Sequence, residues 1–538
     1  MFGFLYKKAK ALFSKKGTDS KQEDFSQKQT PVSRTLADNI KTIREEMLLS
    51  CDVISREITI GKERSTRAAI IFIDGMADKK IINDNVLKPL MNISGFPISP
   101  GSTDRKTGII KVIEQSVLAI SNIAEVQNIN EAISELLTGN TVLFVDGDDT
   151  ALAISAKGFE KRSVDEPPSE AVIRGPRECF IEDIKTNTSL IRRKIKNQEL
   201  RVETMTIGQR TRTVVSIAYI SGVANAGLVE TVKNRLKAIS TDSILESGYI
   251  EQFIEDSPAS IFSTIGYTEK PDVAAAKILE GRVAILVDGT PFVLTAPMLF
   301  AEYFQSAEDY YFRPYYATLL RIVRIIAAMT TILAPAIYVS VTTFHQELLP
   351  TGLLITMASA REGIPFPAFV ECLIMIVTFE ILREAGIRLP RTVGQALSIV
   401  GALVIGESAV AAGLIGAPMV IFVAITAVSS FVVPNLIEPI AVLRFIVLIL
   451  GSMFGGYGIT IAMLGALVHM ASLNSFGFPY LSPTAPFDPG DSKDAIVRAP
   501  LWMMIKRPKS VGAADKKRRD KVVPPPTGEN DGGEDENA

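Results

Sequence analysis

The sequence predicts an α/β cytoplasmic region of two related subdomains, followed by an all-α polytopic membrane domain of four to six spans. Up to Arg324 the chain is mixed and highly charged, whereas the run from Ile325 to Phe344 contains no charged side chain. Twenty residues at about 1.5 Å each can cross a hydrocarbon core of about 30 Å. Further apolar segments follow almost to Leu473. Any function must therefore link a large water-soluble part to a compact membrane part.

Composition argues against several classes of function. The net charge of −2 gives no general attraction to nucleic acid. Three isolated cysteines form no CxxC pair, and two histidines are too few for a zinc cluster. Both histidines, His345 and His469, fall in the membrane half, so the soluble half offers no Ser/His/Asp set. We therefore expect no enzyme activity, no metal and no cofactor.

Six regions are expected along the chain. The first, rich in basic and polar residues, is either an amphipathic helix on an anionic membrane surface or a frayed tail. The six regions are an N-terminal extension (1–35), α/β subdomain 1 (36–160), a charged connector (161–204), α/β subdomain 2 with a coupling segment (205–318), the transmembrane domain (319–475) and a cytoplasmic tail (476–538) that is disordered after about 506.

Two pairs of strand-like segments in the soluble half resemble each other. The matching segments are 67–78 with 213–225, and 141–147 with 282–289. We infer two related α/β subdomains, roughly 36–155 and 205–298. The Asp-Gly steps that begin at Asp146 and Asp288 suit tight hairpin turns. We prefer this interpretation to a metal or phosphate site, because no Walker loop or GxGxxG motif accompanies them.

The segment between the repeats interleaves opposite charges with proline and glycine. One interpretation is a solvated connector. The other is an ordered inter-domain or inter-subunit belt, in which arginine side chains pair with carboxylates. The candidate belt residues are Glu166, Arg174, Arg177, Glu178, Arg192 and Arg193.

The membrane half contains four unbroken apolar segments and a longer one that is interrupted at Gly455. This break predicts either two short spans or one bent helix. Basic residues flank the spans and fill the tail, so the positive-inside rule places the soluble region and the tail in the cytoplasm. An even number of crossings follows, which favours six over four. The candidate spans are Ile325–Phe344, Ile364–Leu382, Gly394–Ile415, Pro418–Ile437 and Ile440–Leu473.

Two carboxylates lie near the middle of predicted spans, Glu371 in the second and Glu407 in the third. Ionisable groups inside a bilayer are costly, which makes them functional candidates. The third span is also rich in small residues, among them Gly401, and this combination suits the wall of a narrow cation path. The alternative is an interhelical packing seam in which Glu407 is hydrogen-bonded.

A set of motifs extends from about residue 36 to 505. It includes Asp74-Gly-Met76, Ile173-Arg-Gly-Pro-Arg-Glu178, Glu308-Asp-Tyr-Tyr311, Arg361-Glu-Gly-Ile-Pro-Phe-Pro367, Gly406-Glu407 and Phe476-Gly-Phe-Pro-Tyr480. As a set, these motifs resemble the A-subunit of the GerA family of spore germination receptors. One departure is Cys179, where relatives usually carry glycine.

The resemblance implies a nutrient-sensing subunit in the inner membrane of bacterial spores, with the N-terminal region and the tail facing the spore core. Implied partners are a transporter-like B-subunit, a C-subunit lipoprotein, membrane lipid and further copies of this chain, which form a pentameric ring with a cation channel. The segment Val404–Glu407 would then lie on the pore. We expect Phe300–Tyr316 to couple the two halves; its candidate residues are Glu302, Glu308, Asp309 and Arg313.

Three alternatives remain open at the level of sequence. A sister family, the SpoVAF-type subunits, shares most of these motifs and acts as an accessory germination channel. A secondary transporter would show inverted repeats, and the membrane half has no visible repeat. A membrane-tethered scaffold or enzyme would act through residues 1–318 alone, and no nucleophile–base set supports catalysis there.

Overall fold

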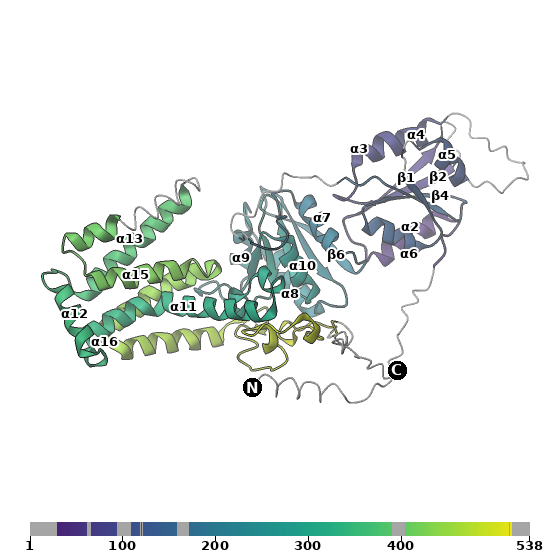
Figure 1. Ribbon diagram of the computed structural model, residues 1–538. Helices are drawn as coiled ribbons and strands as arrows, with labels where there is room; N and C mark the ends of the chain where they lie inside the picture. The colour runs from purple at the N-terminus through teal and green to yellow at the C-terminus, as the bar shows by residue number, and fades with distance from the viewer. Residues whose placement is uncertain are drawn as a thin grey trace, which may run out of the picture. The chain divides into compact units, whose positions relative to one another are not determined.

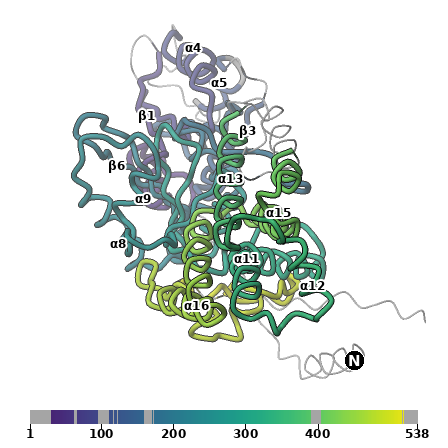
Figure 2. The backbone as a smooth tube through the Cα atoms, turned by 90° about the vertical axis from the view of Figure 1, so that its left-hand side faces the viewer, coloured from purple at the N-terminus to yellow at the C-terminus, as the bar shows by residue number. Residues whose placement is uncertain are grey.

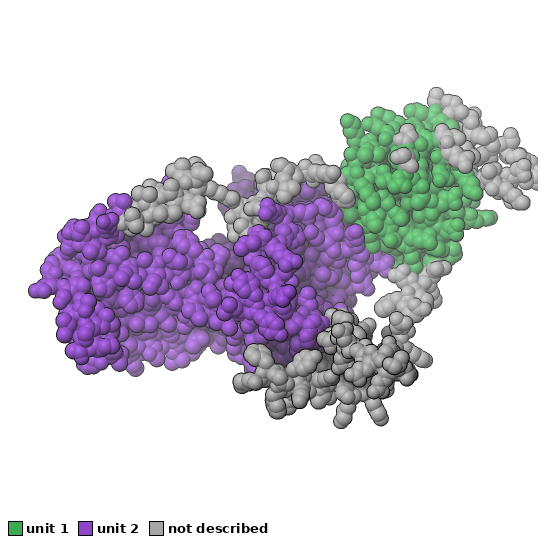
Figure 3. Space-filling view, in the orientation of Figure 1, with its two compact units in different colours: residues 1–46, 53–158 green, residues 47–52, 159–538 purple. Residues whose placement is uncertain are grey.

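The structure, a computed structural model, divides into two compact units (Figure 3). Unit 1 comprises residues 1–46 and 53–158, and unit 2 comprises residues 47–52 and 159–538. The expected helix or tail at residues 1–29 lies outside the described part. The structure describes residues 30–61, 66–93, 109–118, 120, 122–158, 170, 172–389, 404–515 and 517–518.

Unit 1 is built on a five-stranded antiparallel sheet with the strand order β1-β2-β4-β5-β3 (Figure 1). Every residue of β4 and β5 is buried, which explains why these strands are continuous apolar runs without alternation. The elements are α2 (Leu36–Glu46), β1 (Val53–Ile60), β2 (Thr66–Ile73), α3 (Lys79–Ile81), the π-helix η1 (Ile82–Leu87), α4 (Lys88–Asn92), α5 (Ile109–Ser116), β3 (Ile123–Val126), α6 (Ile129–Leu137), β4 (Thr141–Val145) and β5 (Ala151–Ile154).

Subdomain 2, in unit 2, has a second five-stranded antiparallel sheet with the equivalent order β6-β7-β9-β10-β8. Its helices pack on both faces of the sheet, where two separate apolar cores form. The elements are α7 (Ile184–Lys194), β6 (Leu200–Ile207), β7 (Thr213–Ile220), α8 (Ala226–Ala238), α9 (Ser247–Ile254), β8 (Gly266–Thr268), α10 (Pro271–Leu279), β9 (Val283–Val287) and β10 (Val293–Ala296).

The identical strand order confirms the predicted repeat, and the Asp-Gly steps confirm the hairpin interpretation. Gly147 and Gly289 have φ angles of +93° and +91° in the turns that join β4 to β5 and β9 to β10. Each aspartate also accepts a hydrogen bond from the first residue of a helix, Asp146 from Leu36 N at 3.1 Å and Asp288 from Ile184 N at 3.3 Å. The two aspartates are therefore equivalent structural residues of the repeat.

The second repeat begins earlier than the sequence predicted. The expected connector extended to residue 204, but helix α7 and part of β6 lie in about its last half and pack on the second sheet. Helix α7 shows little apolar periodicity because its buried face carries the polar residues Asn187 and Arg192 beside Ile184 and Ile191. Pattern alone could not distinguish such a helix from a charged loop.

The C-terminal half of unit 2 is a bundle of helices, of which α11, α15 and α16 lie side by side (Figure 2). Within the described residues, two helices are long and apolar enough to cross a membrane, Pro314–Thr343 and Pro434–Ser472. The sequence predicted four to six spans. Helix α13 fails this criterion because of its charges, α15 because of its length, and the third predicted span lies partly outside the described residues. The helices are α11 (Pro314–Thr343), α12 (Thr351–Arg361), α13 (Ala368–Arg388), α15 (Ala417–Ser430) and α16 (Ile437–Ser472), with residues 404–411 also helical.

Helix α16 reverses direction at Gly455, whose φ and ψ are 61° and −142°. A Cβ atom placed on Gly451 would lie only 3.1 Å from Cγ1 of Ile459. Residues eight apart in a straight helix are separated by about 12 Å, so the two segments of α16 must run antiparallel. The predicted break is thus a helical hairpin, and its turn contacts Phe344 just beyond the end of α11.

The chain beyond α16 returns to subdomain 2 and packs against it. Ser475 donates its hydroxyl to Thr264 O at 2.6 Å and accepts Met298 N at 3.0 Å. We expected disorder after about residue 506, but the packed segment continues further. Val511 is fully buried, and Ala514 N donates to Val223 O at 2.9 Å. The tail includes β11 (Asn474–Ser475), β12 (Phe478–Pro479) and the 3-10 helices η6 (Ser492–Asp494), η7 (Leu501–Met503) and η8 (Lys509–Val511).

Candidate functional site at the junction of subdomain 2 and helix α11

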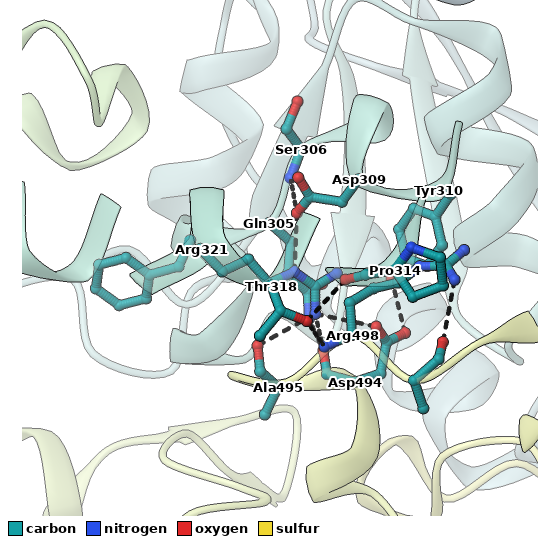
Figure 4. Close-up of polar contacts among 12 residues, drawn as sticks. Gln305, Ser306, Asp309, Tyr310, Pro314, Thr318, Arg321, Asp494, Ala495 and Arg498 are labelled. Atoms are coloured by element: carbon teal, nitrogen blue, oxygen red, sulfur yellow. Dashed lines mark hydrogen bonds and ion pairs between the residues drawn. The ribbon is translucent and has the colours of Figure 1, made fainter. Parts of the chain in front are cut away.

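A fully buried carboxylate, Asp309, connects subdomain 2 to helix α11 (Figure 4). Asp309 lies on the 3-10 helix η3 (Ala307–Tyr310), which follows η2 (Phe300–Phe304). It accepts Arg321 Nε at 2.8 Å and Arg324 Nη1 at 2.9 Å. The two arginines are three residues apart and therefore project from one face of α11. One carboxylate thus contacts two cations near the start of an otherwise apolar helix.

The tail provides a second carboxylate, Asp494, to the same arginine. Arg321 Nη1 donates to Asp494 Oδ1 at 3.0 Å and to the Asp494 carbonyl at 2.6 Å. Gln305 Nε2 donates to this carbonyl at 2.7 Å, and the Tyr310 hydroxyl donates to Asp494 Oδ2 at 2.8 Å. Three segments far apart in sequence, namely η2–η3, α11 and the tail, therefore meet in one polar network (Figure 4).

Two further contacts extend the network. Arg498 N donates to Thr318 Oγ1 at 3.1 Å, and the Arg498 guanidinium lies 5.4 Å from the centroid of the Tyr310 ring. Burial raises the pKa of Tyr310 well above its usual value, and the adjacent Asp494 carboxylate raises it further. The phenol therefore stays protonated and remains a donor to Asp494.

Glu302, on the preceding 3-10 helix η2, forms a second buried cluster. It contacts Arg282 through Oε1 and Lys277 Nζ through Oε2 at 3.1 Å, and it accepts Leu299 N at 2.7 Å. Burial alone would raise the pKa of Glu302, but the two cations outweigh this effect and hold the pKa below its usual value. Glu302 thus stays ionised and holds η2 against α10 and β9.

The other two predicted coupling residues have different positions. Glu308 accepts the backbone N–H of Ile173, so it attaches the belt segment to η3. Arg313 is exposed at the N-cap of α11 and belongs to neither buried cluster. Of the four predicted coupling residues, the structure brings Asp309 and Glu302 into buried ion pairs with groups on other elements.

In the helical bundle, Glu371 is buried in the first turn of α13, although the sequence placed it near the middle of a span. It pairs with Arg361 Nη2 at 3.1 Å and accepts Gly416 N at 3.0 Å. Helix α13 begins at Ala368, after the two prolines, which explains the shift. Another carboxylate, Glu380 on α13, pairs with Arg383 at 2.5 Å and with the buried Arg444 of α16.

Two of the remaining pore candidates are exposed on the helical segment 404–411. Val404 is 51% exposed, and Glu407 is also exposed. Gly401 lies outside the described residues. The chemistry of the whole arrangement is charge pairing and rigid connection; within the described residues there is no group of histidine, cysteine, aspartate and glutamate side chains suited to hold a metal.

Comparison with known proteins gives a family. The sequence model described as Bacillus/Clostridium GerA spore germination protein matches residues 41–510. The chain belongs to the GerA family. Spore germination protein KA of Bacillus subtilis (strain 168) is 46% identical over 525 residues, which is 95% of each chain. The uncharacterized membrane protein YfkQ of the same organism is 43% identical over 89% of this chain and 91% of its own length.

A solved structure is also similar in sequence. It is the crystal structure of the N-terminal domain of the A subunit of the Bacillus megaterium spore germinant receptor GerK3. It is 37% identical, with a TM-score of 0.40, and covers 51% of this chain and 98% of that one. The GerA-family match from residue 41 to 510 includes both halves of the junction, Asp309 and Asp494.

In this GerA-family chain, the buried member of the predicted belt is Arg192. Its Nε and Nη2 donate to both oxygens of Asp52 at 2.7 and 2.9 Å, and Nη2 also donates to Ser50 Oγ at 2.9 Å. The segment 47–52 is thereby fixed to α7. Glu178 accepts Arg193 at 3.0 Å and Lys194 at 3.1 Å.

The remaining predicted belt residues are Arg174, Arg177 and Glu166. The side chains of Arg174 and Arg177 are exposed, and Glu166 lies outside the described residues. The structure thus brings Arg192, Arg193 and Glu178 into contacts within one chain. Whether the exposed arginines hold subunits together stays a prediction.

Sequence reasoning missed the partners of Asp309. From the sequence, basic residues such as Arg321 and Arg324 were used only to predict which side of the membrane the soluble region occupies. Two arginines at positions i and i+3 beside an apolar run also indicate that an acidic side chain from elsewhere in the chain is buried against them. Asp494 and Arg498 carried no such signal, because their segment is short and lacks periodicity. Their roles depend on the return of the tail to α11, which is a tertiary contact.

Proposed function

We propose that this chain is the A-subunit of a nutrient germinant receptor in the spore inner membrane, where movement of subdomain 2 is transmitted to membrane helices that line a cation path. The observation that carries the proposal is the junction network. Asp309 and Asp494 both form ion pairs with Arg321, which lies near the start of the long apolar helix α11. Any displacement of η3 or the tail must therefore move α11 or break buried ion pairs.

The directions of the described helices support an even number of crossings: α11, α15 and the two segments of α16 give four, and α13 with the predicted third span would complete six. Helix α11 leads away from subdomain 2, and its end contacts the Gly455 turn of α16. Gly416, before α15, contacts Arg361 at the end of α12, while Val433, after α15, belongs to the core that contains Phe262 of subdomain 2. The two antiparallel segments of α16 add the last pair of crossings. The soluble region and the tail then share one side, the spore core.

We place the ion path along the exposed helical segment that carries Val404 and Glu407; the predicted pore residue Gly401 is three positions before Val404 in the sequence. Glu371 has two partners inside the chain, which favours a packing role for this carboxylate. A closed path needs several copies of the chain, in agreement with the expected pentameric ring. The expected B-subunit, C-subunit lipoprotein and membrane lipid would surround this ring.

The test is monovalent-cation flux through the full chain reconstituted in vesicles. Glu407→Gln should change selectivity, and Val404→Phe should reduce conductance, because both side chains would face the path. A matched control is Ile421→Phe on α15, which is 60% exposed and should leave both quantities unchanged. Unaltered conductance and selectivity in the Glu407 and Val404 variants would remove this segment from the path.

Germination assays on spores that lack this chain distinguish a receptor subunit from a SpoVAF-type accessory subunit. Deletion of a receptor subunit should abolish the response to its own germinant and leave responses through other receptors intact. Deletion of an accessory channel should slow germination with every germinant. Similarity to spore germination protein KA over nearly the whole chain supports a role in germination.

A further inference from the structure

The tail exposes a compact group of apolar side chains close to the start of α11. Its members are 39% to 55% exposed. We call this group the tail anchor; it consists of Ile496, Val497, Leu501, Trp502 and Met503. Single exposed apolar residues need no explanation, but five within eight positions are a concentration of exposed apolar surface, and such concentrations often contact a partner or a membrane.

The tail anchor is held in place by buried neighbours. Arg498 and Ala499, between its two halves, are buried, and Met504 directly after it is buried as well. Ala499 N donates to Lys493 O at 2.9 Å, and the 3-10 helix η7 presents Leu501, Trp502 and Met503 together. The exposed apolar side chains therefore belong to a packed segment whose orientation is fixed.

Contacts with α11 fix the position of the tail anchor along the axis of that helix. Arg498 N bonds to Thr318, and Arg321 bonds to the carbonyl of Ala495 at 3.2 Å. Thr318 precedes Ile325 by seven residues, or about 10 Å along the helix axis. This distance places the anchor in the headgroup region that borders the hydrocarbon core.

The surface of α11 at this level has the same character. Tyr315, Leu319 and Ile322 are 83%, 55% and 40% exposed. They are spaced four and three residues apart, so they form one stripe on the helix, which continues into the apolar run. Two segments far apart in the sequence thus expose aromatic and aliphatic side chains at one depth.

The composition of the tail fits a lipid surface better than a protein groove. The stretch from Ile496 to Ser510 contains four basic residues and no acidic one, and the sequence that follows adds a further basic cluster. Tryptophan and tyrosine concentrate where a bilayer meets water, and basic residues beside them attract anionic headgroups.

We propose that the tail anchor inserts into the headgroup layer of the bilayer on the side of subdomain 2. The bilayer then fixes the tail segment that carries Asp494, and through Asp494 it fixes Arg321. This inference rests on the proposed membrane location. It assigns a second, peripheral membrane contact to the chain and makes the junction sensitive to the lipid surface.

The sole tryptophan of the chain, Trp502, is a built-in probe. The full chain is reconstituted in phosphatidylglycerol vesicles that contain lipid brominated either near the carbonyl end of the acyl chain or near its terminus. Bromine close to the headgroups should quench most of the Trp502 emission, and bromine at the chain terminus should quench much less. The control is Ile425→Trp in a Trp502→Phe background, since Ile425, near the middle of α15, is 48% exposed within the bundle.

The outcomes separate the two proposals. If the control tryptophan is quenched and Trp502 is not, the proposed insertion of the tail anchor is wrong, while the proposed membrane location of the helical bundle stands. The same result is expected if another protein surface covers the tail anchor. If neither tryptophan is quenched, the chain does not insert in the bilayer, and the proposed function fails as well. Shallow quenching of Trp502 with deeper quenching of the control supports the anchor.

Discussion

Replacement of Asp309 by asparagine should open the junction while the two α/β sheets stay folded. Asp309 accepts charge-assisted hydrogen bonds from both Arg321 and Arg324, and its side chain is fully buried. Loss of one partner of a buried ion pair costs about 3–5 kcal/mol, because the other charge remains buried without compensation. Asparagine keeps one neutral acceptor, so we expect about 3 kcal/mol, the lower end of that range.

Hydrogen exchange of the full chain in detergent measures this cost locally. A loss of about 3 kcal/mol corresponds to roughly a hundredfold increase in the opening equilibrium, since about 1.4 kcal/mol is a factor of ten. Backbone amides of residues 305–312 and 494–499 should exchange faster by this factor, because both segments are tied to the network. Amides of β4 and β9 should not change.

Two further variants test the physical reason. Asp309→Asn combined with Arg324→Met removes the cation whose carboxylate partner is Asp309, while Arg321 keeps its pair with Asp494, and should recover part of the protection. Asp84→Asn is a matched control that breaks an exposed ion pair with Lys88, and it should leave the junction amides unaffected. Unchanged exchange in Asp309→Asn, or no recovery in the double variant, would refute the argument that a buried charge holds the junction together.

Three other predictions follow from single features. Burial raises the pKa of Glu251 to about 7 from an ordinary value of about 4.5. The contribution of protonated Glu251 to stability is therefore complete below pH 4.5 and is lost as the pH rises through 7. The thermal midpoint should fall over this pH window, and Glu251→Gln should flatten the dependence of the midpoint on pH. Gly455→Ala forces a side chain into a conformation reserved for glycine and should destabilise the bundle by about 1–3 kcal/mol in thermal unfolding, whereas Gly465→Ala, which meets open space, should not. Arg174→Ala with Arg177→Ala should lower the native mass if the exposed belt joins subunits, and an unchanged native mass would contradict that role.

Local sequence was sufficient for the elements whose signal is short in range. The Asp-Gly turns, the apolar strands and the repeat of two subdomains follow from residues within a few positions of one another, and the structure confirms all three. The apolar run after Arg324 likewise predicted a long helix. Glycine at Gly455 predicted the break in α16, because few other residues adopt its backbone conformation.

The predictions that failed involve groups whose partners are remote in sequence. Helix α7 was assigned to the charged connector because its buried arginine finds its partner Asp52 140 residues away. Glu371 was predicted to lie near the middle of a span, but it lies in the first turn of α13, where its partners Arg361 and Gly416 come from neighbouring elements. The sequence does not show which residue will pair with a charged side chain that becomes buried. The role of such a side chain can be assigned only when the fold shows its partner.

The sequence by itself determined the order of the parts: two α/β subdomains, an apolar bundle and a basic tail. It also determined which side chains are too costly to bury alone. Only the tertiary structure decided how those charges are compensated, since the tail returns to bring Asp494 and Arg498 beside α11. Hydrophobic pattern depends on neighbours in sequence, whereas charge compensation depends on neighbours in space, and the junction is held by the second kind of contact.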